Sequence, residues 1–161
     1  MQRSEEHLST LFEQTAAGIA ERDLEGRLIR VNERLCQILG RTREQVLGIN
    51  IHELTHPDDR ARSIAAFHQL LVDGQPFSIE KRYLRPDGTA VWVSTTVSPI
   101  RQSAAQQTGS VLAVIVEIKT PACGIGLWQQ YQLLVDQLVA KIVSTWVVFH
   151  KRCSSQIIVT L

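Results

Sequence analysis

The stretch EKRYLRPDGTAVWV at residues 80–93 decides the fold class of this chain. It joins two runs rich in β-branched and aromatic residues, 77–85 and 90–100, through the Pro-Asp-Gly sequence at 86–88. Asp-Gly between two such runs is a strong hairpin signal, because glycine takes the positive φ that a tight turn requires. The sequence therefore predicts two long antiparallel strands that pair across this turn.

Further elements lie on both sides of the hairpin. The apolar run 110–118 predicts a buried strand, and 19–32 predicts two short strands around Gly26. Apolar spacing and terminal glycine or proline residues predict four helices. They span residues 4–17, 33–39, 43–47 and 57–72. Because strands and helices are segregated along the chain, we expect an α+β fold with an antiparallel sheet and helices on one face.

Composition and charge narrow the class of function. Apolar residues make up 44% and charged residues 20% of the chain, as in an ordinary globular domain. The formal net charge of +1 gives no electrostatic reason to expect a nucleic-acid partner. Residues 1–10 lack the apolar core of a signal peptide, and the three cysteines are far apart with no C-x-x-C pair. We expect a cytoplasmic protein that does not bind nucleic acid and has no cysteine-based metal site.

Three stretches resemble the PAS family in its common bacterial form, which carries a PAC segment. They are DLEGRLIRVN at 23–32, HPDDR at 56–60 and the hairpin stretch at 80–93. The resemblance covers residues 8–118 and implies a five-stranded antiparallel sheet, with short helices and one longer helix on one face. It also implies a ligand cavity between the sheet and these helices.

The same resemblance divides the chain into three parts. Residues 1–17 are an N-terminal flanking helix, 18–119 are the PAS/PAC sensory domain, and 120–161 are a tail that is atypical of the family. Where the family usually ends in Asp-Ile-Thr, residues 117–120 read Glu-Ile-Lys-Thr. Aromatic and aliphatic residues of the tail recur at helical spacing, which predicts an amphipathic helix that docks on the domain or on a second copy. A membrane-surface helix and a frameshifted segment are the alternatives.

The resemblance implies a sensory module that binds a small ligand or a partner protein and relays a conformational signal. PAS sensors of histidine kinases and diguanylate cyclases act in this way, so the expected partners are a second copy of the chain and a kinase or cyclase output. The alternative is a structural dimerisation module with a filled core and no ligand. The sequence shows no nucleophile with an adjacent base, no glycine-rich phosphate loop and no metal-ligand spacing, so we expect no enzymatic activity.

Two charged pairs have simpler explanations than catalysis. Asp58 and Asp59 suit the positive end of the helix that begins near Pro57. Glu80 and Arg82 are two residues apart, so they share a strand face, which we expect to be the solvated one.

Strand alternation, phased by the resemblance, puts one set of side chains on the inner face of the sheet. Any pocket there would suit a small apolar or aromatic ligand, with Tyr83 and Thr95 as its polar groups. A filled core fits the same residues. The set comprises Tyr83, Val93, Thr95, Val97, Val111, Ala113 and Ile115.

On the long helix, Ile64, His68 and Leu71 share one face by their spacing and complete the candidate pocket. The resemblance brings His68 close to the place where haem-binding relatives carry an imidazole. Their iron ligand, however, lies about one turn earlier, near Arg62 or Ser63, and neither residue can replace it. We therefore expect a partly buried histidine with a hydrogen-bond partner, and no haem.

Covalent flavin photochemistry of the LOV type is also not expected. LOV relatives need a reactive cysteine just before the long helix, within a segment that here reads NIHELT at 50–55. The thiol that would form the adduct is missing from that segment. Cys36 lies on an earlier helix, where we expect a small buried apolar side chain.

Overall fold

The computed structural model describes residues 2–101, 108–119, 137 and 140–141. Its described helices are α1 (Gln2–Gln14), α2 (Glu33–Leu39), α3 (Arg43–Val46), α4 (Ile51–Leu54) and α5 (Pro57–Asp73). Its described strands are β1 (Gly18–Arg22), β2 (Leu28–Val31), β3 (Phe77–Leu84), β4 (Ala90–Arg101) and β5 (Thr108–Glu117). Most predicted boundaries agree to within a few residues. The sequence does not predict α4, because a single turn carries little periodic signal.

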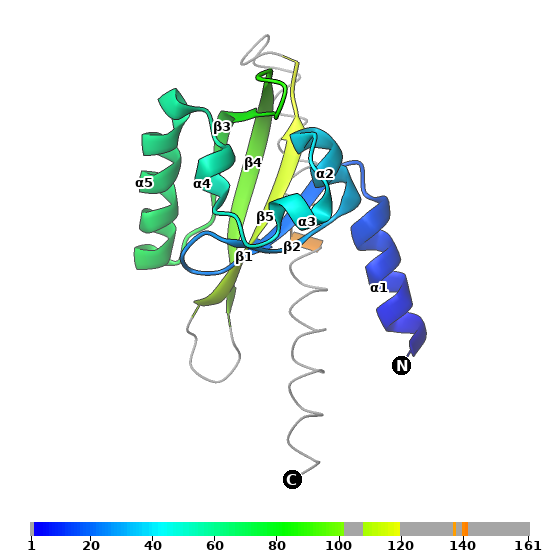
Figure 1. Cartoon of the computed structure of the whole chain (residues 1–161). Coiled ribbons are helices and arrows are strands. Elements are labelled where there is room, and N and C mark those ends of the chain that lie inside the picture. The colour runs from blue at the N-terminus through cyan, green and yellow to red at the C-terminus, as the bar shows by residue number, and fades with distance from the viewer. Residues whose placement is uncertain (1, 102–107, 120–136, 138–139, 142–161) are drawn as a thin grey trace.

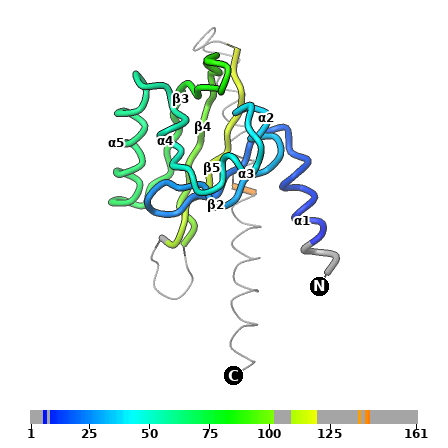
Figure 2. The backbone as a smooth tube through the Cα atoms, in the orientation of Figure 1, coloured from blue at the N-terminus to red at the C-terminus, as the bar shows by residue number. Residues whose placement is uncertain are grey.

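The strands form one antiparallel sheet in the order β2-β1-β5-β4-β3. Helices α2 to α5 lie over one face, which we call the inner face, and α1 lies on the far side of the domain from α5 (Figure 1). The backbone trace in Figure 2 also shows α1 and α5 at opposite sides of the domain. Phe12 of α1 packs against Ile19, Ile100 and Leu112, which point to the outer face. The predicted α+β fold with five antiparallel strands is therefore confirmed.

The β3–β4 hairpin forms where residues 80–93 predict it. Every residue of β3 pairs with a residue of β4. In the turn, Asp87 Oδ1 accepts hydrogen bonds from the backbone N of Thr89 at 2.9 Å and from its hydroxyl at 2.7 Å. Gly88 has a φ of 84°, a conformation that costs other residues free energy. The turn chemistry thus fixes the register, and the register fixes which side chains of β3 face inward.

Asn32 joins α1, β1 and α2 at a point with no solvent exposure. Its Oδ1 accepts hydrogen bonds from the backbone N of Leu35 at 3.1 Å, which caps α2, and from that of Ile19 at 2.8 Å. Its Nδ2 donates to the carbonyl oxygens of Phe12 at 2.8 Å and Ala17 at 3.0 Å. One side chain therefore holds the end of α1 against the start of the sheet.

The predictions for the C-terminal tail lie almost entirely outside the described residues. Only residues 137, 140 and 141 of the tail are described, and they are helical and exposed. Docking of the tail, its membrane-surface alternative and the frameshift alternative all stay predictions. Within the described part of the chain, no helix is long and apolar enough to cross a membrane.

Candidate functional site

The inner face of the sheet is buried beneath the helices. The seven side chains that the sequence assigns to this face are each at most 2% exposed. All but Thr95 belong to one apolar cluster, to which Leu35 of α2 and Phe67 and Leu70 of α5 also contribute. The structure therefore brings the predicted residues together, and their role in ligand binding stays a prediction.

The side of α5 that faces the sheet differs from the predicted one: each buried position lies one residue earlier in the sequence than expected. His68 and Leu71 are exposed, and Ile64 is only partly buried. The face that meets the sheet carries Ser63 and Phe67 instead, which are 3% exposed each. Two neighbouring faces of this helix both carry large apolar residues, Ile64 and Leu71 on one and Phe67 and Leu70 on the other, so spacing alone does not choose between them. His68 is therefore not the partly buried histidine that the sequence suggested.

Lys81 is a buried cation that the sequence reasoning missed. This residue of β3 is 2% exposed, and its Nζ donates to Ser63 Oγ at 2.9 Å and to Thr55 Oγ1 at 3.4 Å. The ammonium also lies 4.9 Å from the centre of the Tyr83 ring. Burial, and then the positive charge of Arg22, lower the pKa of Lys81 to about 7. Lys81 is two residues from Tyr83, so the alternation that places Tyr83 inside also places Lys81 inside.

Arg22 brings a second cation into the same interior. It ends β1, is 3% exposed, and its guanidinium carbon lies 5.0 Å from the centre of the Phe67 ring. Its Nε is buried and has no hydrogen-bond partner in the described part of the chain. Ser63 and Phe67 are one turn apart on α5, so their contacts place the heads of Lys81 and Arg22 in one region.

His52 of α4 borders this cationic pair. Its ring meets Phe67 edge-on, with the ring centres 6.0 Å apart, and its Nδ1 is buried without a partner among the described residues. Burial, followed by the charges of Lys81 and Arg22, lowers the pKa of His52 to about 4. The imidazole is therefore neutral near pH 7.

Asp59 does more than stabilise the start of α5. Its Oδ2 accepts hydrogen bonds from the backbone N of Arg82 at 2.9 Å and from Nε at 2.8 Å, and its Oδ1 accepts from Nη2 at 3.1 Å. These bonds hold the pKa of Asp59 below its usual range. The Arg82 side chain lies on the less buried face of β3, as expected, but it is only 24% exposed and lies over the Trp92 ring at 5.0 Å. The pair fastens α5 to β3.

The interior combines apolar side chains with two buried basic residues, and two of its buried nitrogen atoms, Arg22 Nε and His52 Nδ1, have no hydrogen-bond partner among the described residues. No group of three or more His, Cys, Asp or Glu side chains that could hold a metal occurs within the described ranges. Cys36 is buried, and burial raises the pKa of its thiol, so it serves as the expected small apolar side chain.

Comparisons with known proteins agree with this architecture. A family model described as PAS fold matches residues 28–114. The chain is 28% identical over 146 residues to the probable diguanylate cyclase DgcE of Escherichia coli (strain K12), which covers 78% of this chain and 13% of that protein. It is 30% identical over 96 residues to the sensor histidine kinase TmoS of Ectopseudomonas mendocina, which covers 59% of this chain and 10% of that protein. A crystal structure of a PAS domain from Colwellia psychrerythraea is similar with a TM-score of 0.65 at 22% identity, over 71% of this chain and 96% of that one.

Proposed function

This chain belongs to the PAS fold family and is a sensory module of signal transduction, and we propose that it senses a small molecule held between its inner sheet face and α4–α5. The buried pair Lys81 and Arg22 is the observation that carries this proposal. A core that needs only to be filled gains nothing from two buried cations, because removing a charge from water costs free energy. Ligand sites are mostly apolar with a few polar groups that orient the ligand, and the buried basic residues match this description.

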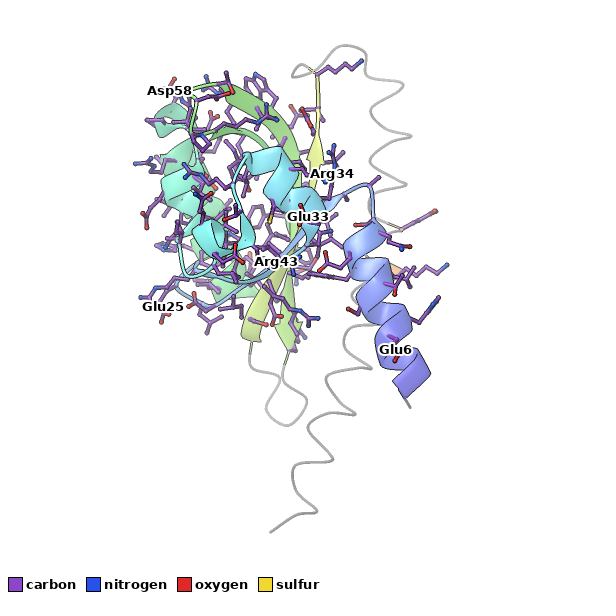
Figure 3. The ribbon with its side chains drawn as sticks, turned by 45° about the vertical axis from the view of Figure 1, so that its right-hand side comes forward. Glu6, Glu25, Glu33, Arg34, Arg43 and Asp58 are labelled. Atoms are coloured by element: carbon purple, nitrogen blue, oxygen red, sulfur yellow. The ribbon has the colours of Figure 1, made fainter. Side chains whose placement is uncertain are left out.

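We propose that the signal leaves the domain through two junctions. The first is Asn32, whose side chain connects the end of α1 to β1 and α2. Glu13 of α1 strengthens this junction through two contacts of 3.0 and 3.1 Å with Nη2 of Arg43, and Glu33, Arg34 and Arg43 lie on the side that faces α1 (Figure 3). A rearrangement of the interior would reach α1 through these bonds.

The second junction is the end of β5. Glu117, its last residue, lies 3.5 Å from Nη2 of Arg34 and 3.8 Å from Nη2 of Arg85. These ion pairs connect the end of β5 to α2 and to the loop after β3. Because β5 lies at the centre of the sheet, a shift of its neighbours would displace the segment that follows Glu117.

The output partner is proposed to be a cyclase or kinase region, in the same or in another polypeptide. The chain spans only about a tenth of the length of the two curated relatives, so we assign their catalytic activity to regions outside the matched segment. A homodimer and a cytoplasmic location belong to the same proposal. The ground for the homodimer is the apolar stripe predicted in the tail. The ground for the location is the similarity to segments of a cyclase and a sensor kinase.

A structural dimerisation module is the second candidate function. The apolar cluster favours it, because Val93, Val97, Val111, Ala113 and Ile115 pack directly against helix side chains. In this alternative the interior never opens to a ligand, and the flanking segments pair two chains.

Mass spectrometry of the full chain, purified under native conditions, separates the two candidates when combined with one overpacking variant. We expect a bound small molecule, and we expect Ala113→Leu to displace it at little cost in stability. Overpacking a filled core typically costs about 1–3 kcal/mol. Ala65→Leu on the exposed side of α5 is the matched control. A large loss of stability in Ala113→Leu alone, with no molecule bound to the unaltered chain, would favour the structural module.

A further inference from the structure

Within the described part of the chain, the interior cations have no carboxylate as a partner. Among the described residues, no acidic side chain lies within salt-bridge distance of Arg22 or Lys81. Asp59 is the one carboxyl group whose charge raises the pKa of Lys81, but both of its oxygens are bound to Arg82. Glu21 is also buried, and its Oε1 accepts a hydrogen bond from Ser110 Oγ at 2.7 Å. Because Glu21 directly precedes Arg22 on β1, its side chain lies on the opposite, outer face of the sheet.

Neighbouring groups compensate these charges only in part. The rings of Phe67 and Tyr83 lie near Arg22 and Lys81, but a ring face is a weaker partner than a carboxylate and leaves N–H donors unused. Lys81 can lose its proton, and its lowered pKa shows that tendency. Arg22 cannot do the same, because a guanidinium stays charged in proteins. A permanent positive charge with an unpartnered Nε therefore remains inside the domain.

We propose that the interior of this domain is a binding site for a small organic carboxylate, with Arg22 as its principal ligand and Lys81 as the second cation. This inference rests on the proposed sensory function and names the chemical class of its ligand. A carboxylate fits better than a phosphate group, although a guanidinium fork can bind either one. A phosphate group brings a third terminal oxygen and more negative charge, which one guanidinium and one remaining lysine donor would leave partly uncompensated. Two donors of Lys81 are already used by Ser63 and Thr55, which leaves one for the ligand.

The rest of the ligand is expected to be apolar. Phe67 lies beneath Arg22, and Tyr83 lies beside Lys81, so a carboxylate held by the two cations has aromatic surfaces at its sides. The unpartnered Nδ1 of neutral His52 offers one further hydrogen-bonding position. The site therefore selects for charge at one end of the molecule and for apolar contact at the other.

The test compares acids with their neutral amides on the full chain at matched ionic strength. Acetate and benzoate are the probes, acetamide and benzamide are isosteric controls, and chloride controls for salt. We expect each acid to raise Tm by about 3 °C or more at about ten times its dissociation constant. The amides and chloride should produce no such shift.

Substitutions then assign the effect to the interior. Arg22→Met should weaken benzoate binding by about 10- to 100-fold, because one charge-assisted contact pair is lost. The unliganded variant should fold as well as the unaltered chain or better, since an unpaired buried charge is removed. Arg27→Met, on an exposed arginine in the β1–β2 connection, is the matched control and should bind benzoate unchanged. Should Arg22→Met fail to fold, Lys81→Met provides the same comparison.

Three results would overturn the inference. Equal shifts from acids and amides would show an interior site without charge selectivity and would leave the sensory proposal standing. A shift by benzoate that survives both Arg22→Met and Lys81→Met would place the anion elsewhere on the surface. If no acid shifts Tm, the carboxylate site is also refuted. The mass-spectrometric search for a bound molecule then decides separately whether the sensory proposal stands.

Discussion

Replacing Asn32 by alanine is expected to be the most damaging single substitution at the junction between α1 and the sheet. The change removes the cap of α2, the hydrogen bonds that Asn32 donates to the carbonyl oxygens of Phe12 and Ala17, and the one that it accepts from the buried backbone N of Ile19. A lost cap costs about 1 kcal/mol, and each buried unsatisfied group costs about 1–3 kcal/mol. Since the loosened segment can admit water, we expect a total of about 3–5 kcal/mol.

Urea unfolding followed by circular dichroism measures this loss, and hydrogen exchange locates it. The amides of residues 12–19 should exchange faster in Asn32→Ala than those of β4, because the junction opens before the sheet does. Asn50→Ala is the matched control, since Asn50 also caps a helix through the backbone N of His52 but is partly exposed. It should cost about 1 kcal/mol. A loss in Asn32→Ala no larger than this control would refute the idea that Asn32 ties α1 to the domain.

Asn32→Asp refines the same prediction through its pH dependence. The carboxylate keeps the acceptor for the backbone N of Ile19 and Leu35 but faces the carbonyl oxygens of Phe12 and Ala17. Its folded-state pKa should lie above the unfolded value, so the protonated form favours folding. The variant should therefore gain stability relative to the unaltered chain as the pH falls, and a gain in the opposite direction would contradict the assigned contacts.

Five further measurements test other parts of the structure. The pKa of His52 is about 4 when folded and 6.5 in the unfolded reference, so its contribution to stability is lost as pH falls from about 6.5 to 4, and His52→Gln should remove this slope. The pKa of Lys81 is about 7 in the folded chain and 10.5 in the unfolded reference, so this residue makes stability rise between about pH 7 and 10.5, and Lys81→Met should remove this rise. Asp59→Asn should destabilise the domain clearly more than Asp58→Asn, and a double-mutant cycle with Arg82→Met should show coupling for Asp59 but little for exposed Asp58. Protein purified with haem and flavin available should show neither a Soret band nor a flavin spectrum. If the tail pairs two copies, a chain ending at Thr120 should be folded and monomeric by light scattering, and the full chain should be dimeric.

The β3–β4 hairpin and the inner face of the sheet could be predicted from the sequence because both depend on short-range rules. Asp87 and Gly88 specify the turn locally, and the period of two along a strand carries that information to every inward position. Tyr83 was placed by this alternation, and Lys81 follows from the same rule. The sequence reasoning passed over Lys81 because a lysine inside a core contradicts the usual preference of that residue for the surface.

The helical side of the site depended on tertiary packing. A helix with apolar residues on two adjacent faces can be rotated by one residue without violating its own periodicity, and only contact with the sheet selected Phe67 over His68 as the inward position. The meeting of Arg22 with Lys81 is equally non-local, because it joins β1 and β3, which are the second and fifth strands of the sheet order. Sequence fixes which strand face each cation occupies. Burial and the absence of a nearby carboxylate are properties of the assembled interior, because desolvation depends on every element that closes over a charge.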